Sequence, residues 1–240
     1  MREIVPIEMD KTIPSVITVL RTQCIPQSSL PEPRVEKLAE EAIRTYKNLT
    51  RPFGILSDIS KNDFSAVYYG EGQNEPETPL EDIYRQSESL ALFAVTIGEA
   101  ACKAISALFD ANEFAAGAML DTTASEATEM AAQILENQYA DYLINNNSVE
   151  NRTGILRFSP GYCGWHVSAQ KKLFEYLKAE EIGIELNESY LMQPLKSISG
   201  VIITGRMEIF EFDDNYPFCS DCTDHACRDR ARFIGKSAIK

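Results

Sequence analysis

Residues 157–174, RFSPGYCGWHVSAQKKLF, decide how the second half of the chain is interpreted. An arginine ends an apolar segment, a Ser-Pro-Gly-Tyr turn follows, and an amphipathic run comes next. Proline presets one backbone angle of such a turn, and glycine allows a positive φ or close backbone approach. Arg157 enters from a predicted strand, so its guanidinium is held rigidly and suits bidentate recognition of a carboxylate. The pattern indicates an anion-binding arginine beside a backbone-lined notch, although a simple structural ion pair is the alternative.

The segments around this stretch have the hydrophobic pattern of short strands. The run after Val167 is amphipathic, with Ser168 as its expected N-cap. These patterns predict strands at 154–158, 182–186, 198–204 and 208–212, and a helix at 168–178.

The middle of the chain is predicted to be mainly helical. Apolar residues recur at helical spacing in three segments, 35–46, 90–108 and 114–143. Residues 1–34, with five prolines, predict a strand and irregular loops, and residues 55–69 predict two short strands around a turn at 60–63. The polar loop Gly70–Pro79 is the expected mobile segment. Helices in the middle with strands at both ends indicate an α+β fold.

Composition excludes several classes of protein. The chain has 240 residues, of which 44% are hydrophobic and 25% charged, as in soluble globular proteins. No apolar run is long enough to span a bilayer, and the start lacks the apolar core of a signal peptide, so a cytoplasmic location is expected. The net charge of −13 argues against nucleic-acid binding. After Cys227 the balance reverses, to five basic residues and one acid, which predicts a solvated, frayed tail or contact with an anionic partner.

A second motif, LNESYLMQPLKSISG at 186–200, follows the first. Together, the two resemble the activation domain of cobalamin-dependent methionine synthase, whose motifs run approximately R-x-x-P-G-Y and L-T/N-E-S-F/Y-x-M-x-P-x-x-S-V/I-S-G. The helical stretch at 96–133 is similar to that of small stand-alone members, which extends the resemblance over most of residues 90–205.

The resemblance implies a fold and an activity. The fold is α+β, an antiparallel twisted sheet with a central helical region, and S-adenosylmethionine binds in a shallow groove on the sheet. The domain presents the sulfonium methyl to a corrinoid held elsewhere, so that one electron and the methyl convert cob(II)alamin to methylcob(III)alamin. The resemblance implies an activation domain over residues 1–212, with its groove mainly at 150–205, and a cysteine-rich tail over 213–240.

The resemblance also implies roles for individual residues. Arg157 would pair with the carboxylate of the methionine moiety, and Tyr162 would face the corrinoid as the one residue at the reacting centre. No general base is expected, because no proton is abstracted. The remaining S-adenosylmethionine-binding residues would be those of the turn (Pro160, Gly161, Cys163, Gly164), those that line or brace the groove (Glu188, Ser189) and those of the strand beside the ligand (Ser199, Gly200, Ile202).

Several of these residues have structural alternatives. Glu188 would be explained without ligand by a bridge to Arg157 or Lys196. Trp165 is expected to be a packing residue, and Glu129 to lie on a solvated helix face.

The sequence also departs from the family pattern. The family often has an aromatic pair after the S-V/I-S-G motif, where this chain has Val201 and Ile202. Backbone contact with a ligand survives that change, whereas a side-chain role does not. An acidic residue that the large enzymes use near the start of the domain has no match here. Modules for homocysteine, folate and corrinoid are missing, so the expected partner is a separate corrinoid protein or cobalamin-dependent methyltransferase.

A cysteine motif closes the chain. Cys219, Cys222 and Cys227 have the spacing C-x-x-C-x-x-x-x-C, which suits zinc or an iron–sulfur cluster. The fourth ligand would be His225, or Cys163 brought in by the fold. The alternative is that these are surface thiols that bind no metal.

Three functions therefore stay open. The leading hypothesis is a reactivation protein that binds S-adenosylmethionine and docks a corrinoid protein. The second is an electron-transfer partner whose cysteines hold a cluster that reduces cobalt. A separate electron donor is a further possible partner. The third is a non-catalytic module that binds the corrinoid protein.

Overall fold

The computed structural model describes residues 1–25, 32–150, 152–211, 216, 219 and 230–234. Its centre is a six-stranded sheet in which every pair of neighbouring strands is antiparallel. The strands, in their order across the sheet, are β1 (Arg2–Pro6), β2 (Phe53–Asp58), β3 (Ser89–Thr96), β7 (Ser197–Arg206), β4 (Thr153–Phe158) and β8 (Arg232–Phe233). The expected antiparallel α+β fold is confirmed.

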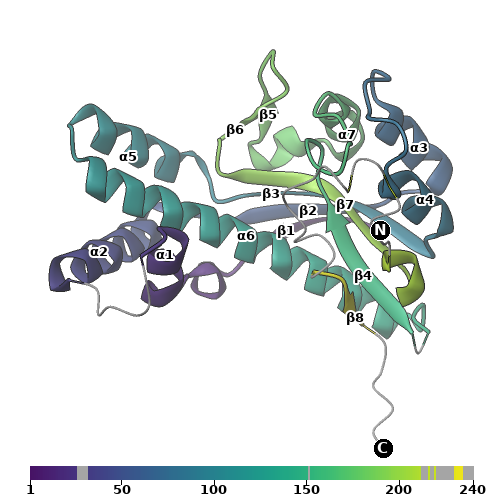
Figure 1. The fold of residues 1–240 in the computed structure, drawn as a ribbon, viewed down its shortest axis with the longest axis horizontal. Helices are drawn as coiled ribbons and strands as arrows, with labels where there is room; N and C mark the ends of the chain where they lie inside the picture. The colour runs from purple at the N-terminus through teal and green to yellow at the C-terminus, as the bar shows by residue number, and fades with distance from the viewer. Residues whose placement is uncertain (26–31, 151, 212–215, 217–218, 220–229, 235–240) are drawn as a thin grey trace, which may run out of the picture.

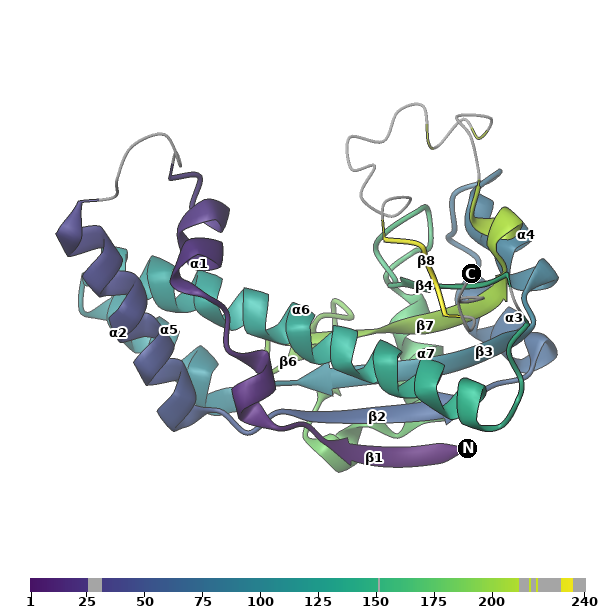
Figure 2. The same cartoon turned by 90° about the horizontal axis from the view of Figure 1, so that it is seen from below.

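One long helix covers one face of the sheet, and three shorter helices cover the other (Figures 1 and 2). The long helix is α6 (Phe114–Asn145), and the shorter ones are α3 (Lys61–Tyr69), α4 (Pro79–Gln86) and α7 (Ala169–Leu177). Each face has its own apolar cluster, with Leu135 and Tyr139 of α6 on one side and Phe64 and Leu173 on the other.

The N-terminal half of α6 extends beyond the sheet into a helical arm (Figure 2). There α1 (Val16–Thr22), α2 (Pro33–Leu49) and α5 (Glu99–Asp110) pack with α6 around a third cluster. The short elements are η1 (Met9–Thr12), η2 (Ala179–Ile182), η3 (Met207–Phe210) and the hairpin of β5 (Glu185–Leu186) and β6 (Met192–Gln193). Within the described parts of the chain, no helix is both long and apolar enough to cross a membrane.

The predicted helix at 90–108 is wrong in its first half, because residues 89–96 form β3. This strand lies in the middle of the sheet and is buried on both faces. Leu90, Leu92 and Ala94 pack on the α7 side, whereas their neighbours Ala91, Phe93 and Val95 pack on the α6 side. A strand that is apolar on both faces has no alternating pattern, so its sequence does not separate it from a buried helix.

The predicted second strand in 55–69 is also wrong, because residues 61–69 form α3. The residues that suggested a turn instead begin this helix. Ser60 Oγ accepts a hydrogen bond from Asp63 N at 3.1 Å and donates to Asp63 Oδ2 at 2.7 Å, which caps the first turn.

Other differences are smaller. Residues 1–34 include helix α1, which the prolines had obscured, and η3 occupies part of the predicted strand at 208–212. The predicted strand at 182–186 is reduced to β5. Ser168 does not cap α7 with its side chain; instead its backbone N donates to His166 Nδ1 at 3.2 Å. The expected domain boundary at 212–213 falls among residues outside the described ones.

Gly200 allows β4 and β7 to approach each other closely. A Cβ at this position would lie 2.0 Å from the backbone oxygen of Phe158 and 3.0 Å from the Phe93 ring. The Phe158 oxygen belongs to the backbone of a strand that is paired with β7, so it has little room to shift and glycine is required here for packing.

We expect Gly200→Ala to lower the free energy of unfolding by about 3 kcal/mol or more, because the added methyl group overpacks two strands. Chemical denaturation followed by circular dichroism measures the loss. The neighbouring control Ser199→Ala removes only a 3.3 Å hydrogen bond to Gln170, and its expected cost is about 1 kcal/mol. Equal losses in the two variants would contradict the steric explanation.

Candidate functional site

Arg157 lies in the middle of a buried ion-pair network between β4 and α6. Its backbone is opposite Ile202 of β7, and its side chain points to the α6 face. Nη2 donates to Glu129 Oε2 at 3.1 Å, and Nε lies 3.5 Å from Glu136 Oε2. The Glu129 side chain is 57% exposed, whereas that of Glu136 is only 4% exposed. The network therefore has a buried end at Glu136 and a solvent-facing end at Glu129.

The Arg157 guanidinium has one nitrogen left for another partner. The residue is only 7% exposed, and among the described residues Nη1 has no hydrogen-bond partner. Burial lowers the pKa of Arg157, and the two carboxylates partly offset that effect. An arginine stays protonated in proteins even so. A buried, charged N–H group without an acceptor is unfavourable, so this nitrogen is suited to receive an external anion.

The turn after β4 is closed by its own backbone. Gly161 N donates to Trp165 O at 2.7 Å, and Trp165 N donates to Tyr162 O at 3.0 Å. Gly161 has φ +95°, which favours glycine, and the space beside its Cα is open. Tyr162, the expected corrinoid-facing residue, is 64% exposed. Pro160 is buried at the start of the turn.

The other side of this turn is fixed to the loop at 70–79. A Cβ on Gly164 would lie 2.3 Å from the Thr78 side chain, and Gly164 O accepts a hydrogen bond from Glu75 N at 2.9 Å. Asn74 Oδ1 accepts from His166 N at 2.9 Å. Trp165 is buried beside Phe64 with their rings edge to face, as its expected packing role requires. The loop expected to be mobile thus holds the turn in place.

The strand residues Ser199, Gly200 and Ile202 are buried in β7. Ser199 Oγ donates to Gln170 of α7, and Gly200 lies against Phe158 O. Ile202 packs in the cluster under α6, beside Arg157 in register. These residues shape the sheet next to Arg157, and their side chains are occupied by protein contacts.

Glu188 and Ser189 lie apart from the Arg157 network, at the exposed tip of the β5–β6 hairpin. Ser189 N donates to Asn187 Oδ1 at 2.9 Å within that tip. Neither proposed bridge to Glu188 forms, because Arg157 pairs with α6 carboxylates and Lys196 pairs with Asp121 at 2.8 Å. The two motifs therefore meet through their strands, whereas the hairpin tip is separate.

Two of the candidate metal ligands approach the same part of the core. Cys219 is buried in the cluster under α7, and Cys163 packs against that cluster. The other candidates, Cys222, His225 and Cys227, lie outside the described residues. Within the described residues, no group of three or more His, Cys, Asp or Glu side chains is arranged to hold a metal ion.

A family model for the vitamin B12 dependent methionine synthase activation domain matches residues 70–213, more than half of the chain. The chain belongs to this family. Arg157, the glycine turn and β7 all lie inside the matched region, whereas β8 lies beyond it.

A crystal structure of the MetH reactivation domain bound to AdoHcy is similar to this activation domain, with a TM-score of 0.58. The match covers 85% of this chain and 78% of the other at 16% sequence identity, a likeness that supports the shared fold alone. No curated protein sequence matches the chain.

Sequence reasoning missed two members of the network in this activation domain. Glu129 was expected to lie on a solvated helix face, and its side chain is 57% exposed, but its pairing with Arg157 was not predicted, and Glu136 was not singled out. Their spacing places both on one face of α6, two helical turns apart, and that face meets Arg157. The spacing was the available signal, but it does not tell which buried cation the face contacts.

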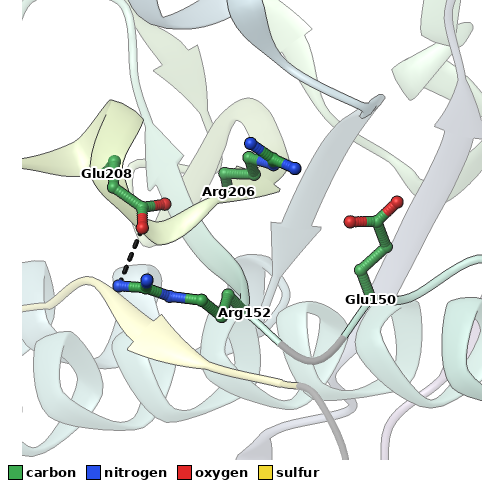
Figure 3. Close-up of a pocket in the computed structure, with 4 residues that line it drawn as sticks. All are labelled: Glu150, Arg152, Arg206 and Glu208. Carbon is green, nitrogen blue, oxygen red and sulfur yellow. Dashed lines mark ion pairs between the residues drawn. The ribbon is translucent and has the colours of Figure 1, made fainter.

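A charged cavity of about 510 Å³ lies at the opposite end of β4 from the turn (Figure 3). It is lined by Glu150, Arg152, Arg206 and Glu208, and an ion pair of 2.7 Å joins Arg152 to Glu208. The Arg152 side chain is largely exposed. This cavity contains none of the predicted site residues. Substitutions of its Arg152 therefore serve as controls for substitutions of the arginines in the ion-pair network.

We expect Glu136→Gln to lower the free energy of unfolding by about 3 kcal/mol, because it leaves buried Arg157 without its buried counter-charge. The matched variant Glu129→Gln removes a half-exposed partner of the same arginine, with an expected cost below about 1 kcal/mol. Urea denaturation of both variants at neutral pH measures the difference. A larger loss for Glu129→Gln would contradict the division into buried and exposed ends.

Proposed function

We propose that this activation domain binds S-adenosylmethionine and presents its methyl group to the cobalt of a corrinoid held by a separate protein. The observation that carries the proposal is the open Nη1 of buried Arg157 beside half-exposed Glu129. Family membership supports the cobalamin context, and the AdoHcy bound to the similar MetH domain agrees with a ligand of this class.

The charges suit the amino acid end of that ligand. Its carboxylate would accept a hydrogen bond from Arg157 Nη1, and its ammonium would approach the exposed carboxylate of Glu129. Charge-assisted bonds of this kind are stronger than neutral ones. The zwitterionic headgroup thereby supplies what each end of the network lacks, an acceptor at the buried end and a donor at the exposed one.

The turn supplies the neighbouring surface. The open space beside Gly161 leaves room for a ligand against the backbone, and the nucleoside would follow Cys163 and Gly164. The turn is held rigidly by Trp165 and the 70–79 loop, so little ordering is needed on binding. In this proposal the activation domain spans residues 1–212, with its groove at 150–205, and the segment 213–240 contributes β8 to its sheet. Glu188 and Ser189 would act at the rim, from the hairpin.

The reaction assigned to the site is reductive methylation. An electron donor reduces cob(II)alamin to cob(I)alamin, whose cobalt takes the methyl group from the sulfonium, giving methylcob(III)alamin and S-adenosylhomocysteine. The protein contributes placement and exclusion of water, and Tyr162, exposed beside the turn, would contact the corrinoid. This reducing chemistry and six cysteines fit a cytoplasmic setting. The corrinoid protein or cobalamin-dependent methyltransferase is the partner.

We expect isothermal calorimetry with the purified protein to show one S-adenosylmethionine site, and Arg157→Lys to weaken binding by about tenfold or more. Lysine keeps the charge but loses the forked geometry that serves Glu129 and the ligand together. Arg152→Lys, in the distant charged cavity, is the matched control and should bind normally. Failure of the wild-type protein to bind S-adenosylmethionine would end the proposal.

Transfer of an isotopically labelled methyl group separates the catalytic role from simple binding of a corrinoid protein. The assay combines the domain, labelled S-adenosylmethionine, a cobalamin-binding fragment of a methionine synthase and a low-potential chemical reductant. Label on cobalt that depends on Arg157 supports reactivation. Binding without transfer would leave the non-catalytic module.

We propose metal binding as a second function, favoured by the convergence of Cys163 and Cys219. The pKa of Tyr216 is raised to about 12, chiefly by its hydrogen bond to Asp82 at 2.6 Å, and both thiols add a smaller electrostatic effect. Both cysteines pack in or against the cluster under α7. Cys222 and Cys227 follow Cys219 at spacings suited to thiolate ligation, and Cys163 would complete the set in place of His225.

We expect anaerobically purified protein to contain about one metal site per chain, with loss of metal in Cys163→Ser and Cys219→Ser but not in the control Cys102→Ser. Metal analysis and a visible spectrum measure this. Iron with sulfide and visible absorption would support electron transfer, and zinc would indicate a structural site. Protein without stoichiometric metal would contradict the proposal.

A further inference from the structure

Arg232 lies beyond the family match, which ends at residue 213, yet it is bound to the strand that carries Arg157. Its backbone forms β8, which places Arg232 opposite Ile155 of β4. Two residues later, Ile234 is buried under α6, and its N donates to Thr153 O at 3.0 Å. One residue of the basic end, Arg232, thus meets an anionic side chain of its own domain.

That side chain is Glu136, which Arg232 shares with Arg157. Nε and Nη2 of Arg232 both lie 2.9 Å from Glu136 Oε1, whereas Arg157 Nε lies 3.5 Å from Oε2. Arg232 Nη2 also donates to Asn137 Oδ1 at 2.5 Å. The Arg232 side chain is 38% exposed and Glu136 is buried, so Arg232 covers the buried end of the network from outside.

We propose that Arg232 is a positioning residue for the amino acid headgroup of the ligand and acts through Glu136 on Arg157. The inference rests on the proposed function and deepens it. By occupying Glu136, Arg232 keeps Arg157 from forming the bidentate pair that arginine and carboxylate commonly adopt. Arg157 then holds Glu136 through Nε alone, and its Nη1 remains available.

Charge balance leads to the same conclusion. Within the ion pairs, the two carboxylates of Glu129 and Glu136 are matched by Arg157 and Arg232, so these four groups are neutral together and a zwitterionic headgroup keeps them neutral. Arg230 adds a more remote positive charge that also acts on Arg157. Without Arg232 the ion-paired groups carry an excess negative charge, which opposes the carboxylate of the ligand. In a partly buried site that repulsion is only weakly screened.

The alternative is that Arg232 only anchors the tail, and ligand choice distinguishes the two roles. S-adenosylmethionine and its decarboxylated form share the nucleoside, the sulfonium and the ammonium, and differ in the carboxylate assigned to Arg157. General loosening of the fold would weaken the binding of both ligands alike. Loss of positioning at Arg157 would weaken the binding of S-adenosylmethionine but not that of its decarboxylated form.

The experiment measures the affinities of both ligands by calorimetry in the full chain and in Arg232→Met. We expect the preference for S-adenosylmethionine over the decarboxylated form to fall by about tenfold, as loss of one charge-assisted interaction implies. Arg232→Lys should restore part of the preference. Arg152→Met, an exposed arginine just before β4, should leave both affinities unchanged.

An unchanged preference in Arg232→Met would overturn the inference while the proposed function stands. A wild-type protein that binds neither ligand would overturn both. Circular dichroism checks the folding of each variant. If Arg232→Met does not fold, Arg232→Gln decides, because it also removes the charge and the forked contact; a preference equal to that of the wild type would then count against the proposal.

Discussion

The ion pair between Arg157 of β4 and Glu136 of α6 is the constraint on which the rest of the site depends. A charged guanidinium between a sheet and a helix is unfavourable unless carboxylates meet it there. α6 supplies one buried and one half-exposed carboxylate to the same side chain. Because α6 also packs along β2, β3 and β7, the position of the network is tied to the core of the domain. A rigid cation with one nitrogen unoccupied follows from that arrangement.

The two sequence motifs serve this constraint in different ways. The first brings Arg157 to the end of a strand and then turns the chain through Gly161, where the backbone has open space beside it. The second supplies β7, in which Gly200 lets the Phe158 carbonyl approach. Gly200, which the family resemblance suggested as a ligand contact, is thus required for packing, whereas Gly161 borders free space. The distinction matters for mutagenesis, since one substitution would test folding and the other binding.

Strand β8 changes the charge balance of the site, although it lies beyond the residues that match the family model. A domain that ended with the family match would keep Arg157, Glu129 and Glu136 but lack the second arginine. Adding a short strand to an exposed sheet edge is a simple way to bring a new side chain to an existing site. Here that strand places Arg232 beside the one buried carboxylate of the network.

The sequence by itself determined the α+β class, the family resemblance, most helices, and the strand–turn–helix unit around Arg157. These features depend on local signals: apolar spacing, turn residues and two ordered motifs. It failed at residues 89–96 because a strand buried on both faces has no alternation, and at residues 61–69 because a serine N-cap resembles a turn.

Only the tertiary structure decided which charges meet. The two α6 carboxylates, Arg157 and Arg232 come from three separate parts of the chain, and their pairing depends on how α6 crosses the sheet and where β8 adds to its edge. It likewise separated Glu188 from Arg157. Ion pairing depends on distance in space and on burial, and neither is encoded in the local pattern around any one of these residues.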